Sequence, residues 1–393
     1  MRLSQRRAVV VAAVLTAVLP ALGGAAAAPE PPGAPLRMAA QGGITGQYVV
    51  MLRQGTDPGS VLRTVAAQPM FTYTSALVGF AARLTDGQVS RLRAEPGVEA
   101  VEQDAVVAAP KPATQVAAAV PEVSWGLTRI GNRARGSGAF AVRATGAKVT
   151  SYVIDTGIEF GHAEFGGRAV PGFDAVGDGR GGADCNGHGT HVAGTVGGAT
   201  TGVARATKLV SVRVLGCDGR GSVATVVAGM NWVAAHAVKP AVANLSTGGA
   251  RSEAADRAVE GLAAAGVFPA VAAGNSDEDA CGVSPAGAPG AFTVAAVDES
   301  DRKASFSNWG GCVDISAPGT GITSAAMGGG LVRMSGTSMA APHVTGVAAL
   351  YKDTYGDVPT AVLASWLSAN ATPGVPSDAP AGTPRLLVYT SGL

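Results

Sequence analysis

Four polar residues stand where their side chains could act together in nucleophilic catalysis. Asp155 closes the apolar segment SYVID, and His188 opens the small-residue segment HGTHVAGTVGG. Asn275 follows the apolar segment VFPAVAAG, and Ser338 lies at the start of the segment GTSMAAPHVTGVAALYKD. Histidine is the usual general base near neutral pH, and a side-chain amide or a helix N-terminus can donate to a developing oxyanion. These residue types predict acyl transfer with serine as the nucleophile.

Each of these residues alone also has an ordinary structural explanation. Asp155 could start a turn, Asn275 could belong to a Gly-Asn turn, and Ser338 could cap a helix. His343 lies five residues beyond Ser338. On a helix, five steps of about 100° turn it well away from the serine. The base for Ser338 is therefore expected from another part of the chain.

A metal site is a competing explanation for the histidines. His188 and His191 are three residues apart, with Asp184 and Cys185 just before them. The HExxH spacing and its glutamate are absent, which weakens the hypothesis of a zinc hydrolase. We therefore favour a structural role for His191.

The elements that must position these residues alternate between strands and helices from Ser124 onward. β-branched apolar runs predict strands at 148–155, 208–215, 241–246, 267–273, 291–297 and 312–317. Helices are predicted at 188–198, 222–238, 252–266, 336–353 and 360–369. The fold class is thus α/β, a mostly parallel twisted sheet flanked by helices. Active sites in such sheets lie beyond the carboxyl ends of the strands.

The first residues have the pattern of an export signal. A basic start is followed by an apolar run from Ala8 to Leu22 and then by small residues. That run is short for a membrane span, so residues 1–28 are predicted to be a cleaved signal peptide rather than an anchor. Residues 46–109 read as strand, helix, strands, helix and strand, a small α+β unit of the split-βαβ type. The Pro- and Ala-rich stretch 110–123 reads as a linker before the main domain, 124–393.

Composition excludes some partners and restricts the chemistry of the cysteines. The net charge is +1, which does not favour a nucleic acid or another polyanion. No second apolar run is long enough to span a bilayer, so no membrane association is expected after signal removal. Export makes two disulfides the expected state of Cys185, Cys217, Cys281 and Cys312. The sequence leaves all three connectivities open.

Four motifs in order resemble one family. VIDTG, HGTHVAG, AAGN and GTSMAAPH resemble the subtilisin-like serine proteases (subtilases) over the segment from Trp125 to about Tyr389. The segments SWGLTRIG, DCNGHGTHVAG and ASFSNWGGCVDISAPG look closest to the proteinase K and aqualysin branch. The resemblance implies that Ser338 is the nucleophile, His188 its base and Asp155 the residue that orients the imidazole. Asn275 and the Ser338 amide would form the oxyanion hole.

The same resemblance implies how a substrate binds. Gly219 and Gly221 in DGRGSV, and Ser246 and Gly248 in LSTGG, would lie along the substrate backbone. Glycine lets backbones approach closely, so a peptide could pair as an added strand with broad sequence tolerance. Residues 272–274, including Ala272 and Gly274, would line a neutral pocket. A secreted endopeptidase that prefers apolar or aromatic residues before the cleaved bond follows from these features.

The family branch also implies cross-links and a cation. It pairs Cys185 with Cys217 and Cys281 with Cys312. Asp314, with the carbonyls of Pro289 and Ala291, matches a calcium site, and oxygen ligands suit such a hard cation.

The unit at 46–109 resembles the prosegment of these proteases. It would act as an intramolecular inhibitor of an autoprocessed zymogen. The product is expected to be an extracellular monomer acting on proteins and peptides. Two other hypotheses stay open at this stage: a non-catalytic binding protein with the subtilase fold, which needs a broken triad, and a metallohydrolase built on the histidine pair.

Overall fold

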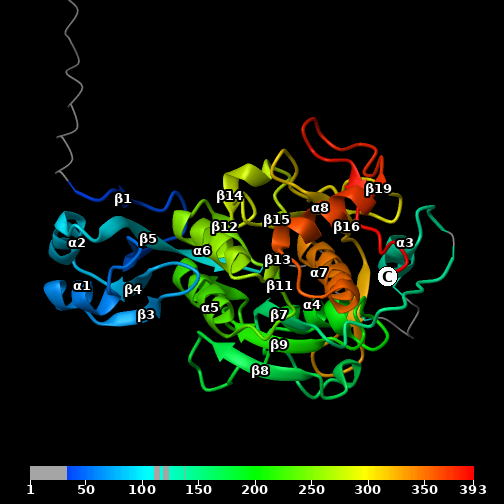
Figure 1. Ribbon diagram of the computed structural model, residues 1–393, viewed down its shortest axis with the longest axis horizontal. Helices are drawn as coiled ribbons and strands as arrows, with labels where there is room; N and C mark the ends of the chain where they lie inside the picture. Colours follow the sequence, from blue (N-terminus) through cyan, green and yellow to red (C-terminus); the bar gives the residue numbers. More distant parts are fainter. Residues whose placement is uncertain (1–32, 110–115, 118–123, 137) are drawn as a thin grey trace, which may run out of the picture. The chain divides into compact units, whose positions relative to one another are not determined.

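A mostly parallel sheet of nine strands forms the centre of residues 124–393 (Figure 1). The structure, a computed structural model, describes residues 33–109, 116–117, 124–136 and 138–393. The predicted signal peptide and most of the predicted linker lie outside the described residues. Within the sheet the strand order is β19-β20-β16-β15-β13-β11-β7-β9-β8. The fold class predicted from the sequence is confirmed.

The strands of this sheet are parallel except for the pair β19 and β20. They comprise β7 (Thr150–Asp155), β8 (Ala169–Asp174), β9 (Lys208–Arg213), β11 (Ala241–Leu245), β13 (Phe268–Ala272), β15 (Phe292–Val297), β16 (Ile315–Pro318), β19 (Thr372–Pro373) and β20 (Leu386–Leu387).

Helices cover both faces of the sheet, which is why its central strands are buried and mostly apolar. The helices are α3 (Trp125–Gly131), α4 (His188–Gly197), α5 (Val223–His236), α6 (Glu253–Ala264), α7 (Thr337–Tyr355) and α8 (Thr360–Asn370). All six residues of β7 are buried. Tyr152 and Ile154 pack in the core with α5 and α6, whereas Val153 packs on the opposite side with α4. Alternation along the strand thus fills two cores.

Short hydrogen-bonded caps fix where the helices begin. Ser222 and Thr225 form a capping box at the start of α5, and the Ser252 side chain accepts from the Ala255 amide at the start of α6. Such caps satisfy amides that have no partner within the helix, typically for about 1 kcal/mol each. The caps fix the residues at which α5 and α6 begin, and so they fix the ends of the loops that precede these helices.

Several elements were not predicted from the sequence. Strand β8 contains Pro171 and Gly172, which break the apolar pattern, and its register with β9 shifts between Pro171 and Phe173. Proline is tolerated there because β8 is an edge strand. Helix α3 is short, and the hairpin of β17 (Ile322–Ala325) and β18 (Leu331–Met334) lacks a long apolar run. Strand β6 (Val116–Ala117) pairs antiparallel with β18.

The N-terminal unit, residues 33–109, has its own sheet of order β1-β5-β2-β4-β3 (blue and cyan in Figure 1). Its elements are β1 (Leu36–Arg37), β2 (Gly43–Leu52), α1 (Pro58–Val65), β3 (Pro69–Tyr73), β4 (Gly79–Arg83), α2 (Asp86–Ala94) and β5 (Val98–Ala108). The predicted split-βαβ order is observed. Strand β1 lies before the predicted start of this unit at residue 46.

Short strands and turns complete the described chain. They are β10 (Arg220–Ser222), β12 (Gly249–Ala250), β14 (Val283–Ser284) and the 3-10 helices Ala163–Phe165 and Ala280–Gly282. Within the described residues, no helix has the length and apolar character needed to cross a membrane.

Candidate active site

A buried carboxylate and a buried imidazole meet at the carboxyl end of β7. His188 Nδ1 lies 2.8 Å from Asp155 Oδ1, which also accepts from the Thr156 amide at 2.7 Å. Asp155 is fully buried and His188 is 2% exposed. The strand end and the start of α4 therefore hold the two side chains together, and the sequence pattern had placed both residues at such ends.

Asp184 fixes the loop that leads into α4. Its carboxylate accepts from the amides of Asn186 and Gly187, from the amide and hydroxyl of Thr190, and from the Thr156 hydroxyl. Its contacts thus join the start of α4 to the end of β7. Sequence reasoning had considered Asp184 only as a metal ligand, although an aspartate just before a helix N-terminus is also a common anchor for amides.

The pKa of His188 reflects two opposing effects. Burial lowers it, but the negative charge and hydrogen bond of Asp155, with a contribution from Asp184, outweigh burial and raise the pKa above the ordinary 6.5. His188 Nε2 has no hydrogen-bond partner among the described residues. The imidazole thus has one nitrogen fixed by a carboxylate and the other available to a proton donor.

Ser338 lies in the first turn of α7, 1% exposed. Its Oγ donates to the Ser246 carbonyl at 3.4 Å, and Ser246 Oγ donates to the Ser338 carbonyl at 3.1 Å. No hydrogen bond joins Ser338 Oγ to His188 among the described contacts. Catalytic hydrogen bonds are often long without substrate and shorten in the reactive complex, so this leaves Ser338 a candidate nucleophile.

Asn275 follows β13 and is held through its carbonyl group. Its Oδ1 accepts from the Thr337 amide at 2.9 Å and from the Thr337 hydroxyl at 2.7 Å. Because both donors contact the oxygen, the amide nitrogen is the group left to donate elsewhere. Sequence reasoning missed Thr337, whose position directly before Ser338 is the only signal for its role in orienting Asn275.

The end of the N-terminal unit pairs with the two segments that are expected to bind a substrate. Strand β5 pairs antiparallel with β10, so that Val107 lies opposite Gly221. The Ala109 amide donates to the Gly219 carbonyl at 2.9 Å. On its other side, Ala108 exchanges two hydrogen bonds of 3.3 Å with Gly248. The end of β5 is thus an extended strand between the two glycine-containing segments.

Two acidic residues of β5 also contact helix N-termini in residues 124–393. Glu102 accepts from the Ser252 hydroxyl and from the amides of Glu253 and Ala254 at the start of α6. Asp104 accepts from the Ala224 amide at the start of α5. Carboxylates are favoured at helix N-termini, although burial raises the pKa of both groups. These contacts fix β5 against the starts of α5 and α6.

A pocket of about 680 Å³ lies beside the end of β5. Its lining includes Ala272 and Gly274, which the sequence predicted for the substrate pocket, together with Gly248 and Asn275, which the sequence placed at the substrate backbone and the oxyanion hole. It also includes two exposed charged residues, Arg251 and Glu278, which sequence reasoning did not place there. The predicted description of a wholly neutral pocket is therefore incomplete. Its alanine and glycine part remains suited to an apolar side chain.

The two other buried histidines are held by backbone carbonyls. His343 Nδ1 hydrogen-bonds to the Met339 carbonyl, and burial lowers the pKa of His343 to about 4. His191 Nε2 contacts the carbonyls of Ile322 and Val332, and burial lowers its pKa to about 3. Both imidazoles are therefore neutral at ordinary pH. These contacts agree with a structural role for His191 and with the exclusion of His343 as the base.

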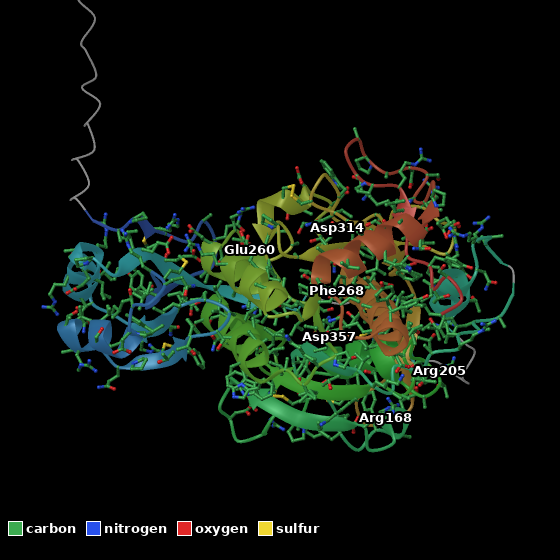
Figure 2. The ribbon with its side chains drawn as sticks, viewed as in Figure 1. Arg168, Arg205, Glu260, Phe268, Asp314 and Asp357 are labelled. Carbon is green, nitrogen blue, oxygen red and sulfur yellow. A yellow bond between two sulfur atoms is a disulfide. The ribbon has the colours of Figure 1, made fainter. Side chains whose placement is uncertain are left out.

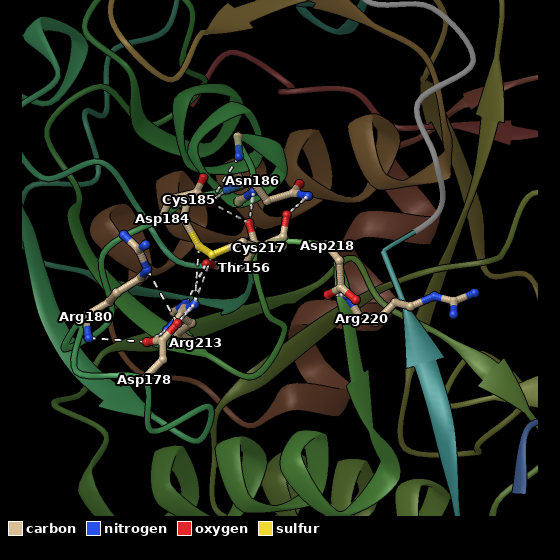
Figure 3. Close-up of a disulfide and its surroundings, with 12 residues drawn as sticks. Thr156, Asp178, Arg180, Asp184, Cys185, Asn186, Arg213, Cys217, Asp218 and Arg220 are labelled. Carbon is tan, nitrogen blue, oxygen red and sulfur yellow. Dashed lines mark hydrogen bonds and ion pairs between the residues drawn. A yellow bond between two sulfur atoms is a disulfide. The ribbon is translucent and has the colours of Figure 1, made fainter. Parts of the chain in front are cut away.

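The loop before His188 is braced by a disulfide (Figure 3). Cys185 is bonded to Cys217, and Cys281 to Cys312. These are the pairs implied by the family resemblance. Each closes a loop of about 30 residues, worth about 3–4 kcal/mol in the loop-entropy description. Arg213 lies beneath the first disulfide, with Nη2 3.3 Å from Cys185 Sγ.

The described residues give no support to a transition-metal site at the histidine pair. Their one cluster of three potential metal-binding side chains is Asp178, Cys185 and Cys217. Both cysteines are in the disulfide, and Asp178 makes a bidentate ion pair with Arg213 that lowers its pKa to about 2. Of the ligands considered with His188 and His191, Cys185 is in the disulfide and the Asp184 carboxylate is bound to amides and hydroxyls of its own loop.

Asp314 lies beside the start of β15 (labelled in Figure 2). Its Oδ2 accepts from the Thr293 amide at 2.7 Å, the one hydrogen bond of this carboxylate among the described contacts. Burial raises the pKa of Asp314 to about 6. Pro289 and Ala291 belong to the loop that enters β15. A desolvated carboxylate without a cationic partner among the described contacts has the donor chemistry of a site for a hard cation.

Comparison with known families gives two matches. Residues 127–387 match the Subtilase family, and residues 47–109 match the family described as Peptidase inhibitor I9. The first match covers more than half of the chain, and all four candidate catalytic residues lie within it.

Individual relatives agree with these matches. The chain is 44% identical over 378 residues to the extracellular serine proteinase of Thermus sp. (strain Rt41A), covering 88% of this chain and 90% of that protein. It is 43% identical over 342 residues to the alkaline serine exoprotease A of Vibrio alginolyticus, covering 87% of this chain and 64% of that protein. A cold-adapted subtilisin-like serine proteinase of known structure has a TM-score of 0.67 and 48% identity, covering 68% and 98% of the two chains.

Proposed function

This chain belongs to the subtilase family and is a subtilisin-like serine endopeptidase, and we propose that Ser338, His188 and Asp155 are its catalytic triad. The observation that carries the assignment is the buried Asp155–His188 hydrogen bond, which leaves Nε2 of the imidazole available. We further propose that the enzyme acts outside the cell, since relatives are named extracellular proteinases and residues 1–28 read as an export signal.

The proposed reaction follows from the positions of these groups. Ser338 Oγ attacks the carbonyl carbon of the peptide bond while its proton moves to His188 Nε2. Asp155 accepts from Nδ1 and stabilises the imidazolium that forms. Collapse of the tetrahedral intermediate breaks the C–N bond, and the proton passes from His188 to the leaving amine. Water then hydrolyses the acyl-enzyme by the same sequence of proton transfers.

The charge that develops on the carbonyl oxygen requires donors that are already in place. The Ser338 amide at the start of α7 and the Asn275 amide nitrogen are proposed to supply them. Support comes from Thr337, which occupies the Asn275 oxygen with two hydrogen bonds and so directs the nitrogen away from itself. The donors need no rearrangement during the reaction, which is the source of their catalytic effect.

Substrates are proposed to bind as β5 does. Their backbone would pair with Gly219 and Gly221 on one side and with Gly248 on the other, and Ser246 would lie next to the nucleophile. Main-chain pairing is tolerant of sequence, which supports broad endopeptidase action. Ala272 and Gly274 support a preference for apolar or aromatic side chains in the pocket.

The N-terminal unit is proposed to be an inhibitory prosegment that the enzyme removes itself. Its last described residues, Ala108 and Ala109, lie between the substrate strands, and the next described residues, Val116 and Ala117, pair with β18. The scissile bond is then expected in or near the predicted linker 110–123. The mature enzyme would then comprise residues 124–393 and the part of the linker that follows the cleaved bond.

Reaction with a sulfonyl fluoride tests the triad. We expect the mature enzyme to be labelled on Ser338, with complete loss of peptidase activity. The labelling rate should fall as the pH is lowered through a midpoint above 6.5, because Asp155 raises the pKa of His188 and only neutral imidazole accepts the serine proton. Peptide mapping by mass spectrometry and inactivation rates measured between pH 5 and 9 provide the readout. Labelling of another residue, or a midpoint below 6.5, would contradict the assignment.

Calcium is proposed to bind at Asp314 with the carbonyls of Pro289 and Ala291, as a structural cation. We expect added calcium to raise the melting temperature and a chelator to lower it, because a ligand of the folded state stabilises by mass action, about 2.7 kcal/mol at one hundred times Kd. The variant Asp314→Asn should lose most of this response, whereas Glu299→Gln, at an exposed carboxylate, should keep it. Differential scanning calorimetry at fixed pH is the measurement. An unchanged calcium response in Asp314→Asn would refute this site.

A further inference from the structure

We propose that Arg220 makes the enzyme favour substrates with an acidic side chain at one position, the position that Ala108 occupies in the precursor. The inference rests on the proposed protease function and adds a specificity determinant to it. It concerns the residue between Gly219 and Gly221, the two glycines proposed to lie along the substrate backbone.

The register of β5 and β10 brings Arg220 opposite Ala108. The backbone N–H and C=O of Ala108 bond to Gly248 on the other side, so Arg220 and Ala108 form a non-hydrogen-bonded pair. In such pairs the two Cα atoms are about 4.5 Å apart and the side chains leave the same face of the ladder. A longer side chain in place of Ala108 would therefore lie next to the side chain of Arg220.

The guanidinium group of Arg220 has no ion pair or hydrogen bond among the described contacts, and the residue is exposed. In Figure 3 its side chain extends past the end of β5, away from the Cys185–Cys217 disulfide. The carboxylate of Asp218, two residues earlier, accepts from the Arg220 backbone amide at 3.0 Å. It fixes the backbone of this loop and leaves the cation free to pair with a substrate.

The segment on the other side of β5 leaves room for a larger side chain at the position of Ala108. Gly248, which pairs with Ala108, has no side chain to fill the space beside it. The charged residues that line the adjoining pocket are Glu278 and Arg251, and Arg251 Nη2 lies 3.3 Å from Asp256 Oδ2. Arg220 is thus a cation opposite this position whose side chain has no ion-pair partner among the described contacts, and glutamate or aspartate is the side chain that complements it.

Cleavage of matched peptides by the mature enzyme tests the proposal. Internally quenched peptides would carry glutamate or glutamine at each of the five positions before the cleaved bond. We expect one position at which glutamate gives about twofold to fivefold higher kcat/KM, the range for an exposed ion pair. The difference should lie mainly in KM, because the contact is remote from the reacting atoms. It should nearly vanish at 1 M salt, where screening acts over about 3 Å.

Variants of Arg220 distinguish this contact from general electrostatics. Arg220→Gln should abolish the preference for glutamate, and Arg220→Glu should reverse it in favour of lysine. Arg135→Gln changes the net charge equally at an exposed residue outside β10, and it should keep the preference. Equal rates for glutamate and glutamine at all positions, or a preference that survives in Arg220→Gln, would overturn the inference. Absence of any peptide cleavage would instead contradict the proposed function.

Discussion

The variant Ser338→Ala is expected to leave the cell as a folded precursor that begins near residue 29 and keeps its N-terminal unit. Removal of the proposed nucleophile should lower peptidase activity roughly 10⁶-fold, the loss seen when the serine of subtilisin, another subtilase, is removed. The same hydroxyl is required for self-cleavage after β5. Folding should survive, because loss of one hydroxyl at a helix start costs at most about 1 kcal/mol. N-terminal sequencing and intact mass of the secreted product measure the outcome.

A matched serine separates loss of catalysis from loss of folding. Ser365→Ala removes an exposed hydroxyl that donates within α8 to the Ala361 carbonyl, and it should be processed normally. Both variants should be expressed in a host that lacks other secreted proteases. A mature Ser338→Ala chain beginning between about residues 110 and 120 would show that another enzyme processes the precursor.

Replacement of Asn275 by alanine is expected to lower kcat by about 10²–10³-fold with little change in KM. A donor that acts on the developing oxyanion stabilises the transition state more than the bound substrate, so its loss appears in kcat. This corresponds to about 2.7–4 kcal/mol. Steady-state kinetics on one peptide, with the melting temperature measured alongside, would test it.

Thr337 supplies the control for this experiment. Thr337→Ser keeps the hydroxyl that donates to Asn275 Oδ1 and should retain most activity. Thr337→Val removes that donor while keeping the shape of the side chain, so the Asn275 amide should be less well oriented and kcat should fall by less than in Asn275→Ala. If Asn275→Ala raised KM and left kcat unchanged, Asn275 would be a substrate-binding residue and not an oxyanion donor.

The central strands and long helices could be predicted because the apolar pattern of their sequences matches the burial that these elements have in the fold. Strands β7, β11 and β13 are buried along their whole length, and their sequences are rich in apolar residues, as is typical of strands covered on both faces. Strand β8 was missed because its proline and glycine resemble a turn, and only its place at the sheet edge makes them acceptable. The hairpin of β17 and β18 depends on contacts with α4, including His191, that no local pattern contains.

The candidate site could be predicted in part for a similar reason. Asp155 and Asn275 follow parallel strands, and His188 and Ser338 begin the helices that return over the sheet, so topology alone brings them to one end. The role of Asp184 could not be inferred, because its five hydrogen bonds depend on how two loops meet. The exposure of Arg220 opposite Ala108 likewise depends on the register between two units far apart in the sequence.

Both outer strands of the nine-stranded sheet carry a proline, Pro171 in β8 and Pro373 in β19. Proline has no amide hydrogen to offer, and β8 is further distorted by its register shift. Neither outer strand is therefore suited to pair edge to edge with a strand of a second molecule. The same protein is proposed to hold foreign peptides by strand pairing, through the glycine segments that pair with β5. Backbone pairing is thus disfavoured at the margins of the main sheet and proposed where hydrolysis follows, which opposes aggregation of the enzyme through the edges of that sheet.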